Sequence, residues 1–490
     1  MSFDAVDSFK KIFEPRSIAI IGVATKGFGF GRGILLSLLA YGYSGTLYPV
    51  NPKGGEIKGL PIYKSVEDIP GMIDFGIIAV PAPDVPDAVE ACRKKGAAAV
   101  EILSSGFTET GAPEGARLEE RLSEIAKTGI RIIGPNCFGV HTPRGGLTFL
   151  PGPDLSRDPG SVAFISQSGG HSIDFAHMGR WKGVAFSKMI SLGNGIDLRE
   201  TELLRYLADD PETEIIGMYI EGVRDGKAFF HALRDAASRK PVIILKGGLS
   251  ESGSRAVLSH TASMGGSSVI WKSVIRQCNA IQAYDLHELS DYALAFSMLP
   301  HGEYRNVSIV GGGGALGVSA ADMAEQYGMR IPELAADIRE EIDSLLPKPG
   351  SSARNPIDIA NPYVTPEVLR EILVKAARDD AIDAQIVIQL LYHYKALAIS
   401  YGAASVKPLT PFRELAETIG DVVRTTNKPV IMVLPDLKQE LESMEVTEMI
   451  RETRKILTAM KIPVFNDLHS AVRSLHALST YARKKQVRQA

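Results

Sequence analysis

The chain has 490 residues, more than one hydrophobic core normally organises, so several domains are expected. Its net charge of −3 excludes the strong positive field of a nucleic-acid-binding protein, and three cysteines without a CxxC pair exclude a disulfide framework and a structural zinc site. No signal-peptide pattern or membrane-length apolar stretch is found, so we expect a cytoplasmic protein that binds neither membrane nor nucleic acid.

The first region alternates continuous apolar runs with helical patterns. Continuous apolar runs are typical of strands buried on both faces of a parallel sheet. Such runs cover residues 17–23, 46–50, 74–80, 97–103 and 131–134. Helical patterns cover residues 34–40, 86–95 and 113–127. We therefore predict one doubly wound, Rossmann-like α/β domain over residues 1–145.

A glycine-rich loop follows the first predicted strand and begins with Gly22, Val23, Ala24 and Thr25. Its glycines permit close approach of a phosphate, and the next helix offers unpaired N–H groups. No GxGxxG follows the strand directly, so on this loop alone a turn without a ligand is equally compatible.

The second strand ends at Lys53, where a nicotinamide-binding domain usually places an acidic residue. A lysine favours a ligand with a phosphorylated ribose, such as CoA with its 3′-phosphate, and a solvated lysine is the alternative. Pro81 follows the third strand, and Ser104 and Ser105 follow the fourth. Because the carboxyl ends of parallel strands share one edge, we expect these residues to line a common crevice.

A Pro-, Gly- and Asp-rich segment at 151–160 looks like a linker, and we predict a second α/β domain over residues 155–298, beginning within it. Its apolar runs cover residues 161–166, 185–192, 214–220 and 241–246. The first run ends in Ser166, Gln167, Ser168 and Gly169, ahead of a predicted helix over 172–179. Small hydroxyl and glycine residues at a strand-to-helix junction can bind an anion, and a capped helix without a ligand is weighed equally.

His260 lies among small residues and glycines, which predicts an accessible imidazole on a loop between a strand and a helix. Glu221 ends the strand that precedes it by one crossover. A carboxylate there could accept a hydrogen bond from one ring nitrogen and leave the other as a nucleophile. The pairing of these two side chains is a hypothesis.

The third alternating region covers residues 304–482, with apolar runs at 306–310, 384–391, 429–434 and 463–465. A glycine cluster over 311–317 follows the first of these runs, and a packing or interface role is favoured there over anion binding. Three open α/β sheets with right-handed crossovers are therefore predicted.

Five of the stretches described above carry a resemblance to a known family, and they stand in that family's order: 50–54, 134–139, 166–169, 219–222 and 259–266. With them the chain resembles the NDP-forming acyl-CoA synthetases of the succinyl-CoA synthetase superfamily, and among these the α subunits of ADP-forming acetate–CoA ligases. The resemblance implies a Rossmann-like CoA-binding domain, a flavodoxin-like domain carrying a phosphohistidine, and a flavodoxin-like ligase-CoA domain. These correspond to the three predicted regions.

The resemblance also assigns roles to residues. It implies that His260 is phosphorylated, that Glu221 orients it, and that the turn from Ser166 to Gly169 faces the phosphoryl group. It places CoA near Gly22–Thr25, Lys53, Pro81 and Ser104–Ser105. The implied reaction is acyl-CoA + phosphate + ADP ⇌ carboxylic acid + CoA + ATP, through an acyl phosphate.

No segment resembles an ATP-grasp module, so the resemblance implies a separate ATP-grasp β subunit that binds ATP or ADP with Mg²⁺. No metal ligands are assigned in this chain. His171 replaces the small residue usual in the family, which leaves the identity of the acid open. A catalytically inactive CoA-binding regulatory or scaffold protein is the alternative. An NAD(P)-dependent dehydrogenase is disfavoured by Lys53 and by the absent GxGxxG.

Overall fold

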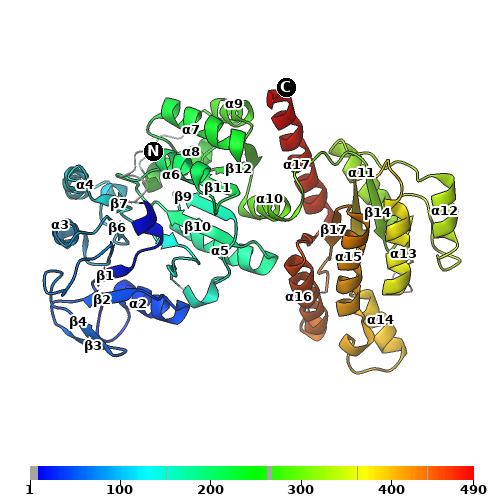
Figure 1. Cartoon of the computed structure of the whole chain (residues 1–490), viewed down its shortest axis with the longest axis horizontal. Coiled ribbons are helices and arrows are strands. Elements are labelled where there is room, and N and C mark those ends of the chain that lie inside the picture. The colour runs from blue at the N-terminus through cyan, green and yellow to red at the C-terminus, as the bar shows by residue number, and fades with distance from the viewer. Residues whose placement is uncertain are drawn as a thin grey trace. The chain divides into compact units, whose positions relative to one another are not determined.

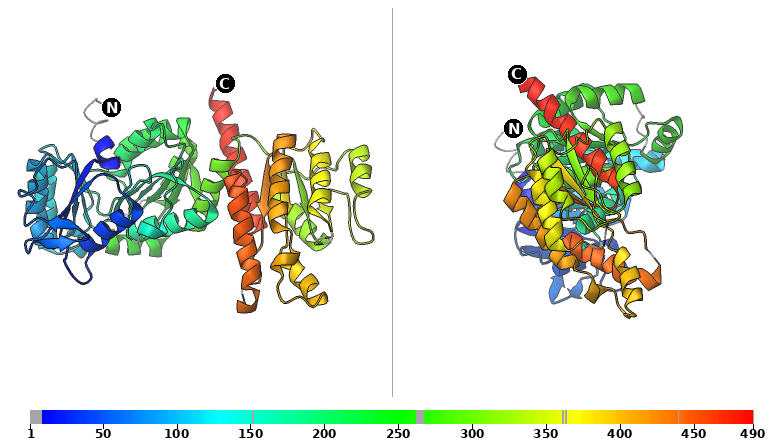
Figure 2. Two further views of the ribbon diagram at one scale, coloured as in Figure 1. Left: turned by 60° about the horizontal axis from the view of Figure 1, so that its bottom comes forward. Right: turned by 90° about the vertical axis from the view of Figure 1, so that its right-hand side faces the viewer.

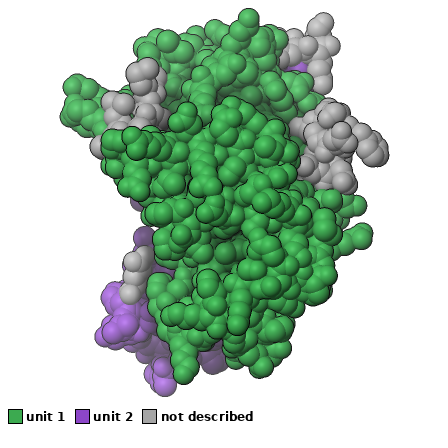
Figure 3. Space-filling view, turned by 90° about the vertical axis from the view of Figure 1, so that its left-hand side faces the viewer, with its two compact units in different colours: residues 1–289 green, residues 290–490 purple. Residues whose placement is uncertain are grey.

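The computed structural model describes residues 9–150, 152–261, 267–360, 362, 364–438 and 440–489; the side chains of residues 153, 258–261 and 487–489 also fall outside it. The chain divides into two compact units, residues 1–289 and 290–490, which are described separately (Figure 3). No helix within the described ranges is long and apolar enough to cross a membrane.

The first sheet of unit 1 is parallel and has the order β2-β1-β5-β6-β7 (Figure 1). Its strands are β1 (Ser17–Ile21), β2 (Thr46–Val50), β5 (Phe75–Ile78), β6 (Ala99–Ile102) and β7 (Arg131–Ile133). The helices are α2 (Phe30–Tyr41), α3 (Val85–Lys94) and α4 (Pro113–Ala126), and β3 (Gly55–Ile57) pairs with β4 (Leu60–Ile62) in a hairpin. The chain turns from one side of β1 to the other, so the topological switch point lies between β1 and β5.

The second sheet has the order β13-β12-β11-β9-β10-β8. Its parallel strands are β9 (Val162–Ser166), β10 (Phe186–Ser191), β11 (Ile215–Ile220), β12 (Val242–Lys246) and β13 (Ile281–Ala283). The helices are α5 (Gly169–Lys182), α6 (Glu200–Asp209), α7 (Gly226–Arg239), α8 (Glu251–Thr261) and α9 (Ser268–Cys278). Here the switch point lies between β9 and β11.

The strand β8 (Gly139–His141) lies within the range predicted for the first domain, yet it pairs antiparallel with β10 of the second sheet. The two sheets also share one hydrophobic core, in which Ile20 of β1 and Met218 of β11 belong to the same buried cluster. The first two predicted domains thus pack as one unit. Their boundaries, 1–145 and 155–298, and that of the third domain, 304–482, stay predictions.

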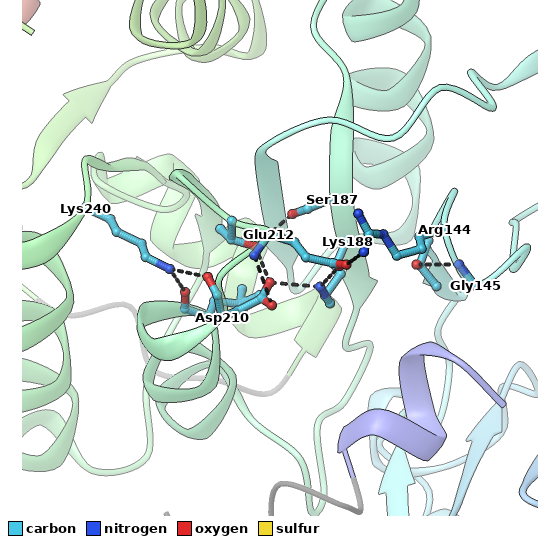
Figure 4. Close-up of polar contacts among 10 residues, drawn as sticks. Arg144, Gly145, Ser187, Lys188, Asp210, Glu212 and Lys240 are labelled. Atoms are coloured by element: carbon cyan, nitrogen blue, oxygen red, sulfur yellow. Dashed lines mark hydrogen bonds and ion pairs between the residues drawn. The ribbon is translucent and has the colours of Figure 1, made fainter.

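A charged cluster lies at the amino end of β11 and is called the lysine cluster: Arg144, Lys188, Asp210 and Glu212 (Figure 4). Lys188 is only 3% exposed, and its Nζ lies 2.8 Å from Asp210 Oδ2 and 2.7 Å from Glu212 Oε2. The Thr213 hydroxyl donates to Asp210 Oδ2 at 2.6 Å. Arg144, three residues after β8, pairs with Glu212 at 2.6 Å and so ties this segment to the second sheet.

Unit 2 contains a third parallel sheet, of order β15-β14-β16-β17-β18. Its strands are β14 (Val307–Gly311), β15 (Ile357–Asp358), β16 (Ala384–Ile388), β17 (Val430–Val433) and β18 (Val464–Phe465). Its helices are α11 (Gly314–Gln326), α12 (Ala336–Asp343), α13 (Pro366–Ala377), α14 (His393–Ser400), α15 (Phe412–Thr426), α16 (Met444–Ala459) and α17 (Leu468–Gln489), and α10 (Leu286–Met298) spans the boundary between the units. Helices α13 and α15 pack side by side over this sheet (Figure 2).

The apolar runs of the sequence correspond to strands in all three sheets, as predicted. The pattern missed β3, β4, β8, β13 and β15, each of two or three residues. One local prediction is wrong: the backbone of His260 is helical and belongs to the last turn of α8, not to a loop. The segment from Glu251 to Leu258 has an acidic first turn and ends in an apolar pair, Val257–Leu258, a pattern that supports a helix.

Candidate functional site

The residues predicted at the carboxyl edge of the second sheet lie together at its switch point. Ser166 ends β9, and Glu221 directly follows β11, the neighbouring strand. Gln167 joins the two: its Oε1 accepts from the backbone N–H of Glu221 at 2.6 Å and of Gly222 at 3.1 Å, and its Nε2 donates to Gly222 O at 2.7 Å. Gln167 therefore fixes the backbone that carries Glu221.

The Glu221 carboxylate is only half-satisfied. Its side chain is buried at 6% exposure, and Oε1 accepts from the Tyr219 hydroxyl at 3.1 Å. Oε2 is buried and has no hydrogen-bond partner among the described residues. A buried acceptor without a donor is costly, so a further donor for Oε2 is expected.

The serines of the predicted phosphate turn hold the start of α5. Ser168 is the N-cap residue, and its Oγ accepts from His171 N at 3.3 Å, while Ser166 Oγ donates to Ser168 O at 2.7 Å. The N–H groups at the start of a helix have no intrahelical acceptor. Within the part of the chain that the structure describes, those of Gly169 and Gly170 have no acceptor, so they are available to an anion or to solvent, and the helix dipole favours an anion there.

Two further side chains lie near Glu221: Lys246, which was not assigned from the sequence, and His171, whose role the sequence left open. Lys246, at the end of β12, is 4% exposed and donates from Nζ to the backbone oxygens of Glu221, at 2.8 Å, and of Gly247. Burial lowers the pKa of Lys246 to about 8, against the opposing charge of Glu221. A charged residue that ends an apolar strand was the signal used for Glu221, and the same signal would have found Lys246.

His171, on the first turn of α5, is the second of these side chains. Its ring lies against that of Tyr219, with 4.3 Å between centroids. Burial lowers the pKa of His171, while Asp174 and Glu221 act in the opposite direction. Its Nδ1 lies 3.4 Å from Ser168 Oγ. The imidazole is therefore held between the phosphate turn and Tyr219.

The side chain of His260 and residues 262–266 lie outside the described residues, so the pairing of His260 with Glu221 stays a prediction. The described backbone places α8 after β12, the strand next to β11, and beside the short 3-10 helix at Thr108–Thr110 of the first domain. Helix α8 thus lies near both the second sheet and the first domain.

The predicted CoA-binding residues gather at the switch point of the first sheet. Gly22 has φ +100°, and a Cβ there would lie 2.3 Å from Ala79 O, so the loops after β1 and β5 touch. Ser104 Oγ donates to Val80 O at 2.5 Å, which brings Ser104 beside Pro81. These contacts bring the loops after β1, β5 and β6 together, while the predicted crevice and its CoA stay predictions.

The remaining predicted CoA-binding residues differ in their solvent exposure. Lys53 and Ser105 are exposed, whereas Ala24 and Thr25 are partly exposed. Val23 is fully buried, and its N–H, like that of Gly22, donates to Val50 O, so neither group faces a ligand. A Cβ at Gly55 would lie 3.2 Å from Thr25 Cγ2, so the loop lies close to the turn after Lys53.

The loop 134–139 links the two candidate sites. Asn136 N donates to Ser104 O at 2.9 Å, next to the CoA-binding loops. A Cβ at Gly169 would lie 2.2 Å from the Phe138 ring, so this ring packs directly on the start of α5. The carboxyl edges of the first two sheets therefore meet at Phe138.

The glycine cluster of the third domain lines a cavity of about 350 Å³ at the carboxyl end of β14. Asp358 Oδ1 accepts from Gly313 N at 3.1 Å and from Ala360 N at 2.9 Å. A carboxylate of the chain itself therefore lies next to the start of α11.

Family models match both domains of unit 1: a CoA binding domain over residues 16–143 and a succinyl-CoA ligase-like flavodoxin domain over residues 159–296. The α subunit of acetate–CoA ligase [ADP-forming] I from Pyrococcus furiosus is 35% identical over 98% of each chain. Acetate–CoA ligase [ADP-forming] I from Archaeoglobus fulgidus is 33% identical over 97% of this chain, which spans 64% of that longer protein.

Among solved structures, the dinucleotide-forming acetyl-coenzyme A synthetase 1 of Candidatus Korarchaeum cryptofilum, in complex with phosphate and ADP, has a TM-score of 0.81. It is 29% identical, and the match covers 98% of this chain and 97% of that chain. These matches confirm the α/β fold with a CoA-binding domain and the ligase class of the enzyme. The chain belongs to the ADP-forming acetate–CoA ligase family.

Proposed function

We propose that this chain is the CoA-binding, phosphohistidine-carrying subunit of an NDP-forming acyl-CoA synthetase, with His260 as the phosphorylated residue. The observation that carries the proposal is Glu221 Oε2 at the switch point of the second sheet, a buried carboxylate oxygen for which the described residues supply no donor. A ring N–H of His260, which belongs to α8 after the adjacent strand, would be that donor.

The first step transfers the acyl group to phosphate. A phosphate oxygen attacks the thioester carbonyl, a C–O bond forms, the C–S bond breaks, and the leaving sulfur takes the phosphate proton. The free N–H groups of Gly169 and Gly170 and the dipole of α5 would stabilise the phosphate. The exposed Lys53 suits the phosphates of CoA, because the lysine supplies positive charge.

The second step transfers the phosphoryl group to His260. The neutral ring nitrogen attacks phosphorus, a P–N bond forms, and the P–O bond to the carboxylate leaving group breaks. Glu221 would hold the ring tautomer and stabilise the positive charge that develops on the ring. In the third step the P–N bond breaks as ADP accepts the phosphoryl group, which regenerates neutral His260.

Nucleotide and Mg²⁺ would be bound by a separate ATP-grasp β subunit. The name "subunit alpha" of the Pyrococcus relative and the extra length of the Archaeoglobus protein both support a further nucleotide-binding part outside this chain. The substrates are then a small carboxylic acid, CoA and phosphate.

The test is phosphorylation of the complex with its ATP-grasp subunit by γ-labelled ATP. The chain should gain an acid-labile, base-stable phosphate, and His260→Ala should abolish it. His231→Ala, at an exposed histidine of α7, is the matched control and should label normally. Persistent labelling of the His260→Ala variant would reject the proposal.

A further inference from the structure

The helix whose last turn contains His260 and the helix that follows it are both attached to one buried lysine. Lys246 ends β12 and is 4% exposed, and its Nζ donates to Gly247 O in the turn that leads to α8. Ser254 Oγ of α8 donates to a backbone oxygen of the same turn at 2.8 Å. The Trp271 ring of α9 lies with its centroid 5.1 Å from Lys246 Nζ. Contacts from both helices therefore converge on Lys246.

The same lysine holds Glu221, the proposed partner of His260. Lys246 Nζ donates to the backbone oxygen of Glu221 at 2.8 Å. In the described part of the chain Lys246 forms no ion pair with the Glu221 carboxylate, and Oε2 of that carboxylate has no donor there. The two charges still act on each other: burial lowers the pKa of Lys246 to about 8, and Glu221 acts in the opposite direction.

This arrangement separates the charge of the lysine from its hydrogen bonds. Burial favours the neutral form of a carboxyl group, and a nearby cation favours the ionised form. Lys246 supplies such a cation while its N–H groups go to backbone oxygens. A direct ion pair with Oε2 would supply the same charge and would occupy the acceptor that a ring N–H of His260 needs.

From this geometry we propose that Lys246 is a positioning residue for phosphoryl transfer, which keeps Glu221 ionised with Oε2 free and fixes the turn that leads to His260. The inference rests on the proposed function, because it assigns the free oxygen to His260. Lys246 contacts neither phosphate nor CoA in this scheme and acts through Glu221. Its loss should therefore lower kcat and leave the KM for CoA unchanged.

Lys246→Met removes the charge and the N–H donors and keeps an unbranched side chain of similar length. The rate at which γ-labelled ATP phosphorylates His260, in the complex with the ATP-grasp subunit, should fall by about 10-fold to 100-fold. Lys188→Met, at another lysine buried in the same sheet, is the matched control, and its folded fraction should be labelled at the wild-type rate.

The pH profile of this rate separates a charge effect from a packing effect. Lys246 loses its proton near its pKa of about 8, so the wild-type rate should fall as the pH rises above that value. Nearby groups titrate elsewhere, since burial raises the pKa of Tyr219 and lowers that of His171. The alkaline fall should be absent in Lys246→Met and present in Lys188→Met.

Three results would overturn the role of Lys246 and leave the His260 assignment intact. These are a wild-type rate that stays constant above pH 8, an unchanged alkaline fall in Lys246→Met, or a wild-type labelling rate in that variant at neutral pH. The first measurement needs no variant, so it decides even if Lys246→Met does not fold. Labelling that persists in His260→Ala would overturn the proposed function instead.

Discussion

The two ends of β11 carry carboxylates that are equally buried and differently satisfied. Asp210, before the strand, and Glu221, after it, are each 6% exposed. Asp210 accepts from Lys188 Nζ at 2.8 Å and from Thr213 Oγ1 at 2.6 Å. Glu221 accepts from Tyr219 at one oxygen, and its other oxygen has no partner among the described residues.

This difference shows that burial does not by itself distinguish a structural carboxylate from a functional one. A fully paired group lowers the energy of the fold and has nothing left to offer a substrate. A buried acceptor without a donor destabilises the fold, and a ligand or a reacting side chain that donates to it removes this free-energy cost. We therefore expect substitutions at the two ends to separate stability from catalysis.

The largest expected effect is on catalysis, at the carboxyl end. Glu221→Gln keeps the shape and removes the charge that would orient and stabilise a phosphorylated imidazole, so kcat should fall by about 10³-fold. CoA affinity, measured by calorimetry, should stay unchanged. Turnover equal to that of the wild type would make Glu221 a purely structural residue.

At the amino end the expected effect is on stability. Lys188→Met leaves the buried Asp210 carboxylate without its cation and should lower the free energy of unfolding of unit 1 by about 3 kcal/mol. Hydrogen exchange of the amides in β9–β11 measures this loss. The folded fraction should keep normal kcat, and a variant with wild-type exchange rates would show that the pair contributes nothing.

A third buried carboxyl group sharpens the comparison through pH. Glu101, on β6, is 3% exposed, and its Oε2 accepts from Val140 N of β8 at 2.9 Å. Burial raises the pKa of Glu101 to about 8 from an ordinary 4.5, so the folded chain keeps a proton that the unfolded chain releases. The free energy of unfolding should therefore fall as pH rises from about 4.5 to 8, by about 1 kcal/mol between pH 6.5 and 7.5.

Denaturant unfolding at several pH values measures that slope. Glu101→Gln, which carries no proton to lose, should flatten it over the same window. An identical slope in the variant would assign the pH dependence to another group.

The smallest expected effect belongs to the exposed member of the lysine cluster. The Arg144 side chain is 61% exposed and pairs with Glu212 at 2.6 Å. Exposed ion pairs contribute little to stability, so Arg144→Ala should lower the free energy of unfolding by less than about 1 kcal/mol. High salt, which screens the pair in the wild type, should abolish this difference. If Arg144→Ala lost as much free energy of unfolding as Lys188→Met, membership of the cluster, and not burial, would determine how much an ion pair contributes to stability.

Much of the fold follows from local pattern, because strands buried on both faces must be apolar throughout. This is why the runs ending at Ser166 and Ile220 could be placed, and with them the switch point of the second sheet. The strand β8 could not be placed, since three residues carry too little pattern and the residues that it pairs with on β10 are 48 to 52 positions away in the chain. Short strands depend on tertiary pairing, which local sequence does not encode.

The candidate site was predictable where it depends on strand ends and unpredictable where it depends on packing. Glu221 and the turn at Ser166 follow from strand position alone. The stacking of His171 on Tyr219 and the bonds from Gln167 to the Glu221 backbone require knowing which loops face each other. The helical backbone at His260 was missed because serine, threonine and glycine neighbours favour a loop by propensity.

Because β8 pairs with β10 of the second sheet, the point at which an expression fragment begins matters. An expression fragment that starts near residue 155 would lack Gly139–His141 and would leave the edge of β10 without its antiparallel neighbour. Met189 and Ile190 would then present unpaired backbone groups flanked by apolar side chains, which is a template for intermolecular strand addition. A fragment meant to stay monomeric should instead begin before residue 139 or retain the whole of residues 9–289.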